Sequence, residues 1–216
     1  MTRLLALAWA LILPWAYVLP PERVLQEVAK ARPGKTPLSL LASLEGTDPS
    51  WPTEVQIDLH PLGGVRIDDQ RGGRWVLRRG RIVAASQPLA PVWLPQIEAL
   101  LQPSVDSLSQ LLIEFGVDSL QISLARCGAD DCFVLGQRDG GAQLWIEKDA
   151  FEPRAWVLPT GRRFEWSAYR SWGKIKFPSQ IGIFDGSERL ATLRTLRVEP
   201  APGLRPEDFS DRWARL

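Results

Sequence analysis

The chain has 216 residues, of which 45% are hydrophobic and 24% charged, as in an ordinary globular protein. Its 26 Lys and Arg residues nearly balance 25 Asp and Glu residues and are scattered, which excludes the basic stripe of a nucleic-acid-binding protein. The 18 prolines and 17 glycines suit the many turns of an all-β protein.

The first residues have the pattern of an export signal. Arg3 is followed by an apolar run from Leu4 to Leu13, which is too short to span a bilayer because a spanning helix needs about 20 residues. The pattern predicts a signal peptide over residues 1–18, with an uncleaved anchor or an N-terminal core helix as alternatives. No Cys follows the apolar run, so we do not expect lipidation of the N-terminus.

A short amphipathic helix is predicted over residues 22–32. Val24, Leu25 and Val28 form one apolar stripe, and Pro33-Gly34 ends the helical pattern. The helix is therefore expected to dock on the rest of the protein by one face.

Short strands with glycine turns follow this helix. In residues 54–60, Val55, Ile57 and Leu59 alternate with polar residues. Weaker or shorter alternations of the same kind occur at residues 38–43, 65–68, 75–78 and 81–86. Strands at a spacing of roughly ten residues are typical of an antiparallel meander, and one polar face indicates that water wets one side of the sheet.

The strand pattern is interrupted over residues 87–117, which contain several prolines followed by a helical pattern. Ser104 or Asp106 is the predicted N-cap, and Gly116 the predicted stop. The apolar residues at helical spacing are Val105, Leu108, Leu111, Leu112 and Phe115. Such a helix needs a surface to cover, and the open face of the sheet is the candidate.

The two cysteines flank a short turn. Cys127 and Cys132 enclose the sequence Gly-Ala-Asp-Asp between two apolar strands. In an exported protein this spacing predicts a disulfide across a hairpin, and it does not match a C-x-x-C redox motif.

The stretch from Leu144 to Phe184 has the clearest strand pattern. It contains four of the ten tryptophans, namely Trp145, Trp156, Trp166 and Trp172. A last long strand is predicted over residues 188–199, with Leu190, Leu196 and Val198 on one side.

Residues 144–210 resemble the LolA/LolB-like superfamily of outer-membrane lipoprotein-sorting proteins. Trp145-Ile146-Glu147-Lys148 followed by Pro153-Arg154 matches a strand, turn and Pro-Arg motif of the family. Tyr169 before Pro178-Ser179 matches a later pair, and residues 202–209 match the final Pro-rich motif loosely. These motifs mark turns and sheet corners.

The resemblance implies a mainly β fold with a few helices. Its expected form is a strongly curved antiparallel sheet, an unclosed β-barrel, whose open face the helices cover. Residues 19–216 would make one such half-barrel domain. The resemblance further implies a periplasmic protein of a Gram-negative bacterium that binds a lipid or an acylated lipoprotein. Inner- or outer-membrane transfer partners are implied as well, and we expect a monomer.

The chain departs from the sorting proteins in two places. The periplasmic carrier has an Arg-Pro pair on an early strand, whereas this chain has His60-Pro61. The outer-membrane receptor has a lipidated Cys, which this chain lacks. The alternative function is an envelope interaction or sensor scaffold with the same fold and a filled core.

The predicted ligand-binding side chains lie on the lid helix and on the aromatic strands. Rigid apolar surface of this kind binds acyl chains at about 25 cal/mol per Å² buried. The candidates are Leu108, Leu111, Leu112, Phe115, Trp145, Trp156, Trp166 and Phe184. The alternative for each is that it fills the core.

No constellation for catalysis, metal binding or a cofactor is recognised. Asp58 and His60 share the polar face of one strand, but neither a nucleophile nor a G-x-S-x-G elbow accompanies them. We therefore expect a protein that is not an enzyme, with an exposed His60 on a wet sheet face. Arg78, Arg79 and Arg81 form a small basic spot that could touch lipid headgroups.

Overall fold

The computed structural model describes residues 18–31, 36–87, 91–137 and 140–215. The predicted signal peptide therefore lies outside the described residues except for Val18, which packs against the core. No helix in the described part of the chain is long and apolar enough to cross a membrane.

A single 12-stranded antiparallel sheet dominates the fold, in the order β5-β4-β3-β2-β1-β12-β11-β10-β9-β8-β7-β6. Because β5 and β6 stand at opposite ends of this order and are not paired, the barrel is unclosed, as the sequence predicted. The strands are β1 Leu38–Gly46, β2 Glu54–His60, β3 Gly64–Asp69, β4 Arg74–Arg78, β5 Arg81–Ala85, β6 Ile122–Cys127, β7 Asp130–Gly136, β8 Gln143–Glu147, β9 Pro153–Val157, β10 Arg162–Trp172, β11 Ile175–Asp185 and β12 Glu188–Pro200.

The strands follow the alternation in the sequence. In β1 the buried side chains are Leu38, Leu40, Ala42 and Leu44. In β2 the buried Val55, Ile57 and Leu59 face the same interior. Side chains that alternate along a strand point to opposite faces, so the sheet has a concave apolar side and a mostly polar convex side.

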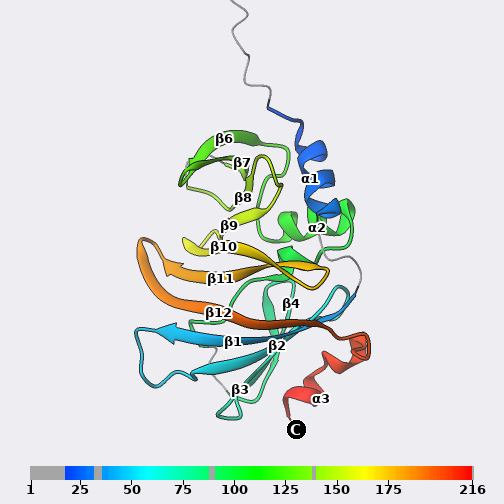
Figure 1. Cartoon of the computed structure of the whole chain (residues 1–216), viewed down its shortest axis with the longest axis vertical. Helices are drawn as coiled ribbons and strands as arrows, with labels where there is room; N and C mark the ends of the chain where they lie inside the picture. The colour runs from blue at the N-terminus through cyan, green and yellow to red at the C-terminus, as the bar shows by residue number, and fades with distance from the viewer. Residues whose placement is uncertain (1–17, 32–35, 88–90, 138–139, 216) are drawn as a thin grey trace, which may run out of the picture.

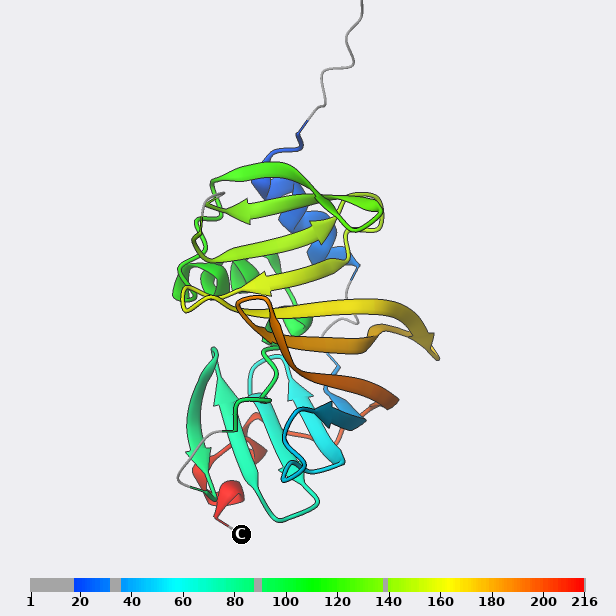
Figure 2. The same cartoon turned by 90° about the vertical axis from the view of Figure 1, so that its left-hand side faces the viewer.

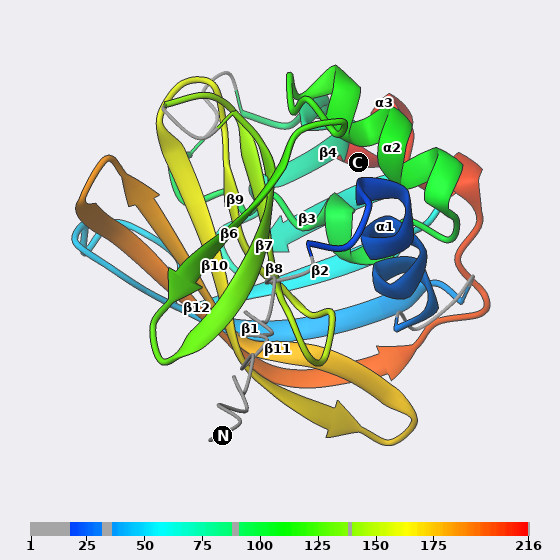
Figure 3. The same cartoon turned by 90° about the horizontal axis from the view of Figure 1, so that it is seen from above.

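Helical segments cover the concave side. They are α1 Pro21–Lys30, the 3₁₀ helix η1 Glu98–Leu101 and α2 Val105–Glu114. In Figure 1, α1 and α2 lie together beside β6 to β9, and the view from above shows them on one side of the curled sheet (Figure 3). Ser104 caps α2 by accepting from the N–H of Ser107, which satisfies a free donor of the first turn.

A β-bulge corrects one prediction. Leu196 was expected on the buried side of β12 with Leu190 and Val198, but it is 45% exposed. The register between β1 and β12 shifts at this point, where Leu41 pairs with Arg197 and Ala42 with Thr195. Before the bulge, Ala191, Leu193 and Thr195 face inward, so Leu190 and Leu196 both lie on the outer side of the strand. The extra residue reverses the alternation and returns Val198 to the buried side, so the prediction was wrong for both leucines and correct for Val198.

The predicted disulfide is confirmed. Cys127 and Cys132 are bonded, with their Cα atoms 5.8 Å apart, on the hairpin of β6 and β7. The hairpin turn is tighter than the sequence suggested, since β6 ends at Cys127 and β7 begins at Asp130.

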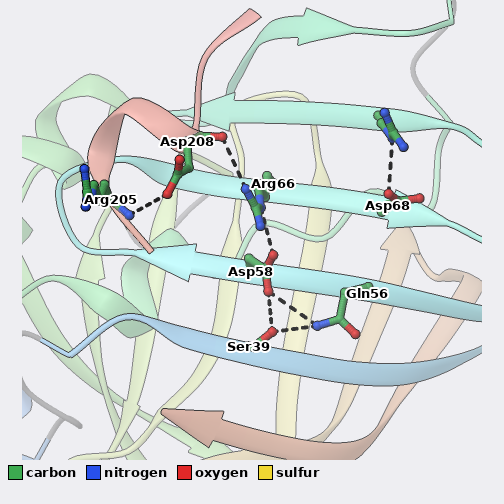
Figure 4. Close-up of polar contacts among 8 residues, drawn as sticks. Ser39, Gln56, Asp58, Arg66, Asp68, Arg205 and Asp208 are labelled. Atoms are coloured by element: carbon green, nitrogen blue, oxygen red, sulfur yellow. Dashed lines mark hydrogen bonds and ion pairs between the residues drawn. The ribbon is translucent and has the colours of Figure 1, made fainter. Parts of the chain in front are cut away.

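The C-terminal tail covers part of the convex face of the sheet. It contains η2 Pro206–Asp208 and α3 Asp211–Ala214, and α3 packs against β4 and β5. The Arg66 side chain joins sheet and tail, because it donates to the Asp58 carboxylate at 2.8 Å and to the carbonyl of Asp208 at 3.4 Å (Figure 4). Its guanidinium also lies 5.0 Å from the centre of the Trp213 ring.

Asp58 consequently lies in a covered polar network and not on a wet face. Its carboxylate accepts from the Ser39 hydroxyl and from Arg66, as Figure 4 shows. Asp58 is only 7% exposed, and its partner Arg66 links it to the C-terminal tail. His60 is half-buried at the end of the same strand, where Nδ1 accepts the backbone N–H groups of Leu62 and Gly63 at 3.0 and 2.9 Å.

Candidate ligand-binding site

The candidate site is the concave face of the sheet beneath the segment of residues 92–116, which we call the lid. The residues in and before η1 supply more of the side chains that cover the sheet than α2 does, although only the α2 pattern was predicted to cover it. The buried lid side chains are Trp93, Leu94, Ile97, Ala99, Leu100, Leu101, Leu108, Leu111 and Leu112. All of them belong to the same core cluster as the inner sheet residues, so the lid fills the concave face in this closed state.

An aromatic column connects the lid to the sheet. Phe115, at the C-terminal end of α2, meets Trp156 of β9 edge-to-face at 4.6 Å between ring centres. Trp156 in turn meets Trp166 of β10 at 6.3 Å in the same orientation. Edge-to-face contacts of this kind add about 0.5–1.5 kcal/mol to area burial. Three of the predicted ligand-binding residues are thus in contact.

Three buried indole groups in this interior have unsatisfied donors. The Nε1 atoms of Trp75, Trp156 and Trp166 have no hydrogen-bond partner among the described residues. The three side chains are at most 1% exposed. An unpaired buried donor costs about 1–3 kcal/mol, so a molecule that brought acceptor oxygens to these groups would recover that free energy.

Two predicted ligand-binding residues do not join this interior. Trp145 lies between the buried Leu144 and Ile146, and strand alternation therefore places it on the convex face, where its Nε1 donates to Gln143 Oε1 at 2.8 Å. Phe184 follows the buried Ile183 and is likewise turned away from the core cluster.

Arginine side chains cover Phe184 on the convex face. The guanidinium of Arg163 lies 4.5 Å from the ring centre, and that of Arg189 lies 5.0 Å from it. These cation–π contacts explain why Phe184 is only 6% exposed although it lies outside the core cluster.

The turn between β4 and β5 holds the lid by a set of contacts that we call the latch. Arg79 and Gly80 form this turn, with φ angles of 50° and 71°. The N–H of Gly80 donates to the Glu98 carboxylate, and the carbonyl of Gly80 accepts from Gln96 Nε2 at 3.4 Å. Arg79 forms an ion pair with Glu114 at 2.5 Å.

Glu98 is the electrostatic centre of the latch. It lies on η1 and is 4% exposed. Burial raises the pKa of the Glu98 carboxyl to about 7, although the backbone N–H groups of Gly80 and Arg79 act in the opposite direction. Desolvation disfavours the charged form of an acid, so the closed lid holds a carboxyl that takes up a proton near neutral pH.

A polar cleft opens at the rim beside the latch. It has a volume of about 320 Å³ and lies between the turn after β2, the turn after β4, η1 and α2. Its polar lining includes Arg78, Arg79, Glu98, Gln102 and Gln110. The predicted basic spot is therefore divided, since Arg78 and Arg79 line the cleft and Arg81 does not.

His60 also lines this cleft, but it is not paired for catalysis. Its Nδ1 accepts two backbone N–H groups, which leaves the proton of the neutral ring on Nε2. Burial lowers the pKa of His60 and so favours this neutral form. Within the described residues, no three His, Cys, Asp or Glu side chains are grouped so that they could hold a metal ion.

Sequence reasoning missed Glu98, Gly80 and the two tryptophans Trp75 and Trp93. The last two meet edge-to-face at 5.6 Å between the sheet and the lid. A lone acidic residue in an otherwise apolar run, as at Glu98, was the available signal for a buried carboxyl. The contact between Gly80 and Glu98 spans 18 residues of sequence, and no local pattern indicates it.

Comparison with solved structures identifies the fold. A LolA superfamily protein from Nitrosomonas europaea superposes with a TM-score of 0.55 at 11% identity, over 91% of this chain and 100% of that one. An outer membrane lipoprotein-sorting protein domain from Vibrio parahaemolyticus gives 0.46 at 12% identity, over 90% and 98% of the chains. A DUF1329 family protein from Desulfovibrio piger gives 0.47 at 10% identity, over 90% and 97%.

No family model and no curated protein sequence match the chain. The LolA-like fold that the motifs indicated is confirmed by the Nitrosomonas europaea structure, which has the highest TM-score of the three. At 11% identity this similarity shows the fold alone, and it does not identify a ligand.

Proposed function

We propose that this protein is a non-enzymatic periplasmic carrier that binds a lipid or the acyl chains of a lipoprotein on the concave face of its sheet. The observation that carries the proposal is the aromatic column under the lid, with the unpaired indole N–H groups of Trp156 and Trp166. Acyl chains would match the apolar walls, and the ester or amide oxygens next to them would accept from the indoles.

Binding would occur by displacement of the lid. The side chains of Leu108, Leu111 and Leu112 occupy the concave face in the closed state, and acyl chains would take their place as the lid swings away. The exchange replaces one apolar filling by another, so burial free energy largely cancels. The contacts of the latch, which favour the lid-covered state, and the unpaired indoles, which favour the lipid-bound state, then decide how tightly lipid binds.

The rim cleft would receive the headgroup. It adjoins both the lid and the β4–β5 turn, and an anionic or zwitterionic group would bind Arg79 there by replacing Glu114 as its partner. The N-terminal signal pattern supports export of the chain to the periplasm, where donor and acceptor membranes would be its transfer partners.

The first experiment is chemical. Protein purified from cells is extracted with organic solvent, and the extract is examined by mass spectrometry for co-purified lipid. Displacement of a bound fluorescent fatty acid by a diacyl phospholipid then measures the affinity. Bound lipid, or displacement by the phospholipid, is the expected result. A clean protein that also ignores added phospholipid and acylated peptide would contradict the proposal.

A pair of variants tests the indole contribution. Trp156→Phe keeps an aromatic ring but removes the donor, and Trp145→Phe makes the same change on the convex face. Loss of one neutral hydrogen bond costs about 0.5–1.5 kcal/mol, which corresponds to an affinity roughly 2- to 10-fold weaker for Trp156→Phe. Trp145→Phe should bind phospholipid like the wild type. Equal affinities of the two variants would show that the indole N–H group of Trp156 does not contribute to phospholipid binding.

The alternative is an envelope scaffold whose interior stays filled. The dense packing of lid side chains on the concave face favours it. A spin label placed on the exposed Ile113 of α2 distinguishes the two functions, because its mobility should rise with added phospholipid in a carrier and stay constant in a scaffold.

A further inference from the structure

We infer that the free edge of β5, together with the groove beside it, is a binding site for an extended polypeptide segment that adds to the sheet as a further strand. The site lies at the rim of the lipid-binding interior, where it shares Leu94 and Gln96 with the lid and Gly80 with the latch. It would bind a polypeptide backbone and not an acyl chain, so the inference goes beyond the proposed function. If both hold, the cargo is an acylated polypeptide and not a free lipid.

The strand β5 ends the sheet and carries apolar side chains on an exposed edge. Ile82 is 38% exposed and Val83 is 50% exposed, and no strand in the described part of the chain pairs with the outer side of β5. In Figure 2, β5 is the strand at the left of the lower half of the molecule. Native proteins usually protect such edges with charge, proline, a β-bulge or a covering segment. The β5 strand has a bulge at Val83, between the pairs Leu77–Ile82 and Val76–Ala84, so the regular edge available for pairing is the part around Ile82.

The hairpin geometry directs backbone groups toward this free edge. Arg78 and Arg81 pair directly across the two-residue turn, and Leu77 pairs with Ile82. In an antiparallel ladder, hydrogen-bonded and non-hydrogen-bonded pairs alternate. The pair that closes the turn is hydrogen-bonded, so Ile82 directs its N–H and C=O away from β4. An incoming strand would pair with these groups.

The groove beside the edge provides a pocket for a side chain. It has a volume of about 300 Å³ and lies between β5, the start of the lid and the β9–β10 turn. Its apolar lining is Leu77, Ile82, Val92, Leu94, Leu158 and Phe164. Strand addition typically combines main-chain pairing with pockets for alternate side chains, and both features are present here.

An unpaired acceptor in the groove points to an N–H-bearing ligand. Gln96 Nε2 donates to the carbonyl of Gly80 at 3.4 Å, which fixes the orientation of the amide. Its Oε1 is buried and has no hydrogen-bond partner among the described residues. A peptide N–H would satisfy this oxygen once the amide turned toward the groove, whereas an acyl chain could not.

A positive charge in the groove indicates that the bound polypeptide carries an acidic group. Arg162 lines the groove, and none of the ion pairs among the described residues includes it. We therefore expect an extended segment that places an apolar side chain in the groove and a carboxylate near Arg162.

The test uses a fluorescein-labelled, amidated peptide of sequence Glu-Val-Thr-Val-Thr-Val and measures binding by fluorescence anisotropy. Two further peptides carry N-methyl groups, one on the valine amides and one on the threonine amides. A strand at the edge pairs through alternate amides only. One methylated peptide should therefore bind at least about tenfold more weakly than the parent, and the other should bind within about threefold of it.

Two variants on the same strand provide the protein control. Ile82→Lys places a charge in the groove, and Val83→Lys places the same charge on a neighbouring exposed residue that does not line it. Ile82→Lys should weaken peptide binding by at least about tenfold, and Val83→Lys should change it less than about threefold. Val83→Lys should also retain the phospholipid affinity of the wild type.

Three results would overturn the inference. These are no binding of the peptide, equal loss with both methylated peptides, and a wild-type dimer that Ile82→Lys dissociates in sedimentation, which would assign the edge to a second copy of the chain. Failure of peptide binding with phospholipid binding intact leaves the carrier function standing. Peptide binding without any lipid binding would support the strand-addition site and contradict the carrier function.

Discussion

The ring of Phe115 lies directly on the backbone of Gly80. A Cβ atom added to Gly80 would fall 1.8 Å from Cζ of Phe115, far inside van der Waals contact. The lid is therefore closed onto a turn that has room for it only because the turn residue has no side chain.

Gly80→Ala should loosen the lid. The added methyl group must displace Phe115, and overpacking of this kind typically costs about 1–3 kcal/mol of unfolding free energy. We expect faster uptake of the fluorescent fatty acid together with this loss of stability, measured by stopped-flow fluorescence and denaturant unfolding.

Gly128→Ala is the matched control. Gly128 has the same φ of 71° as Gly80, but nothing lies within 4 Å of its added Cβ. It should therefore show only the backbone strain of an L-residue at positive φ, about 1–2 kcal/mol, with unchanged uptake of the fatty acid. Equal effects of the two substitutions would show that the Phe115 contact does not hold the lid.

Glu98 should make stability depend on pH. Its pKa is raised from 4.5 to about 7 in the folded protein, so the folded state binds the proton more tightly than the unfolded state. The contribution is fully present below about pH 4.5 and is lost as the pH rises through about 7. A shift of this size corresponds to about 3 kcal/mol, as an order of magnitude.

The measurement compares unfolding free energies at pH 5 and pH 8 for the wild type and Glu98→Gln. The variant should lose less stability on going to pH 8, because it has no carboxyl to ionise there. Glu114→Gln, which removes an acid from the partly exposed ion pair with Arg79, should reduce the pH dependence only slightly, because the Glu114 charge raises the pKa of Glu98 less than burial does. An unchanged pH dependence in Glu98→Gln would contradict the assignment.

Arg66→Met should release the C-terminal tail. The substitution leaves the Asp58 carboxylate buried without its cation and removes the bond to the carbonyl of Asp208. Breaking a buried pair on one side typically costs about 3–5 kcal/mol. Limited proteolysis should cut the tail of the variant faster than that of the wild type.

Arg74→Met is the control for this prediction. Arg74 also lies over the Trp213 ring, at 5.6 Å, but its ion pair with Asp68 is substantially exposed. Such a pair contributes at most about 1 kcal/mol, so stability should fall little. A tail that remains protected in Arg66→Met would show that α3 docks without this arginine.

Removal of the disulfide should destabilise the β6–β7 hairpin modestly. The loop between Cys127 and Cys132 is short, and the loop-entropy relation gives about 2 kcal/mol for it. The double variant Cys127→Ser/Cys132→Ser should lose about that much unfolding free energy. Alkylation of the wild type without reductant should add no label, and two added labels would refute the bond in the purified protein.

The sequence by itself determined the strands, the amphipathic helices and the disulfide, and it limited the N-cap of α2 to Ser104 or Asp106, because each of these features rests on residues close together in the chain. Period-2 alternation correctly placed Val55, Ile57 and Leu59 on one buried face. The motifs of residues 144–210 likewise indicated the LolA-like fold, since turn and corner residues act locally.

Only the tertiary structure decided which aromatic residues line the interior and what holds the lid. In an all-apolar run such as Leu144-Trp145-Ile146, alternation does not say which face is buried, and a single bulge placed Leu196 and Val198 on opposite faces of β12. The burial of Glu98 depends on a turn 18 residues away, and the link from Asp58 through Arg66 to the tail depends on the far C-terminus. Both are long-range contacts, and long-range contacts leave no periodic trace in a sequence.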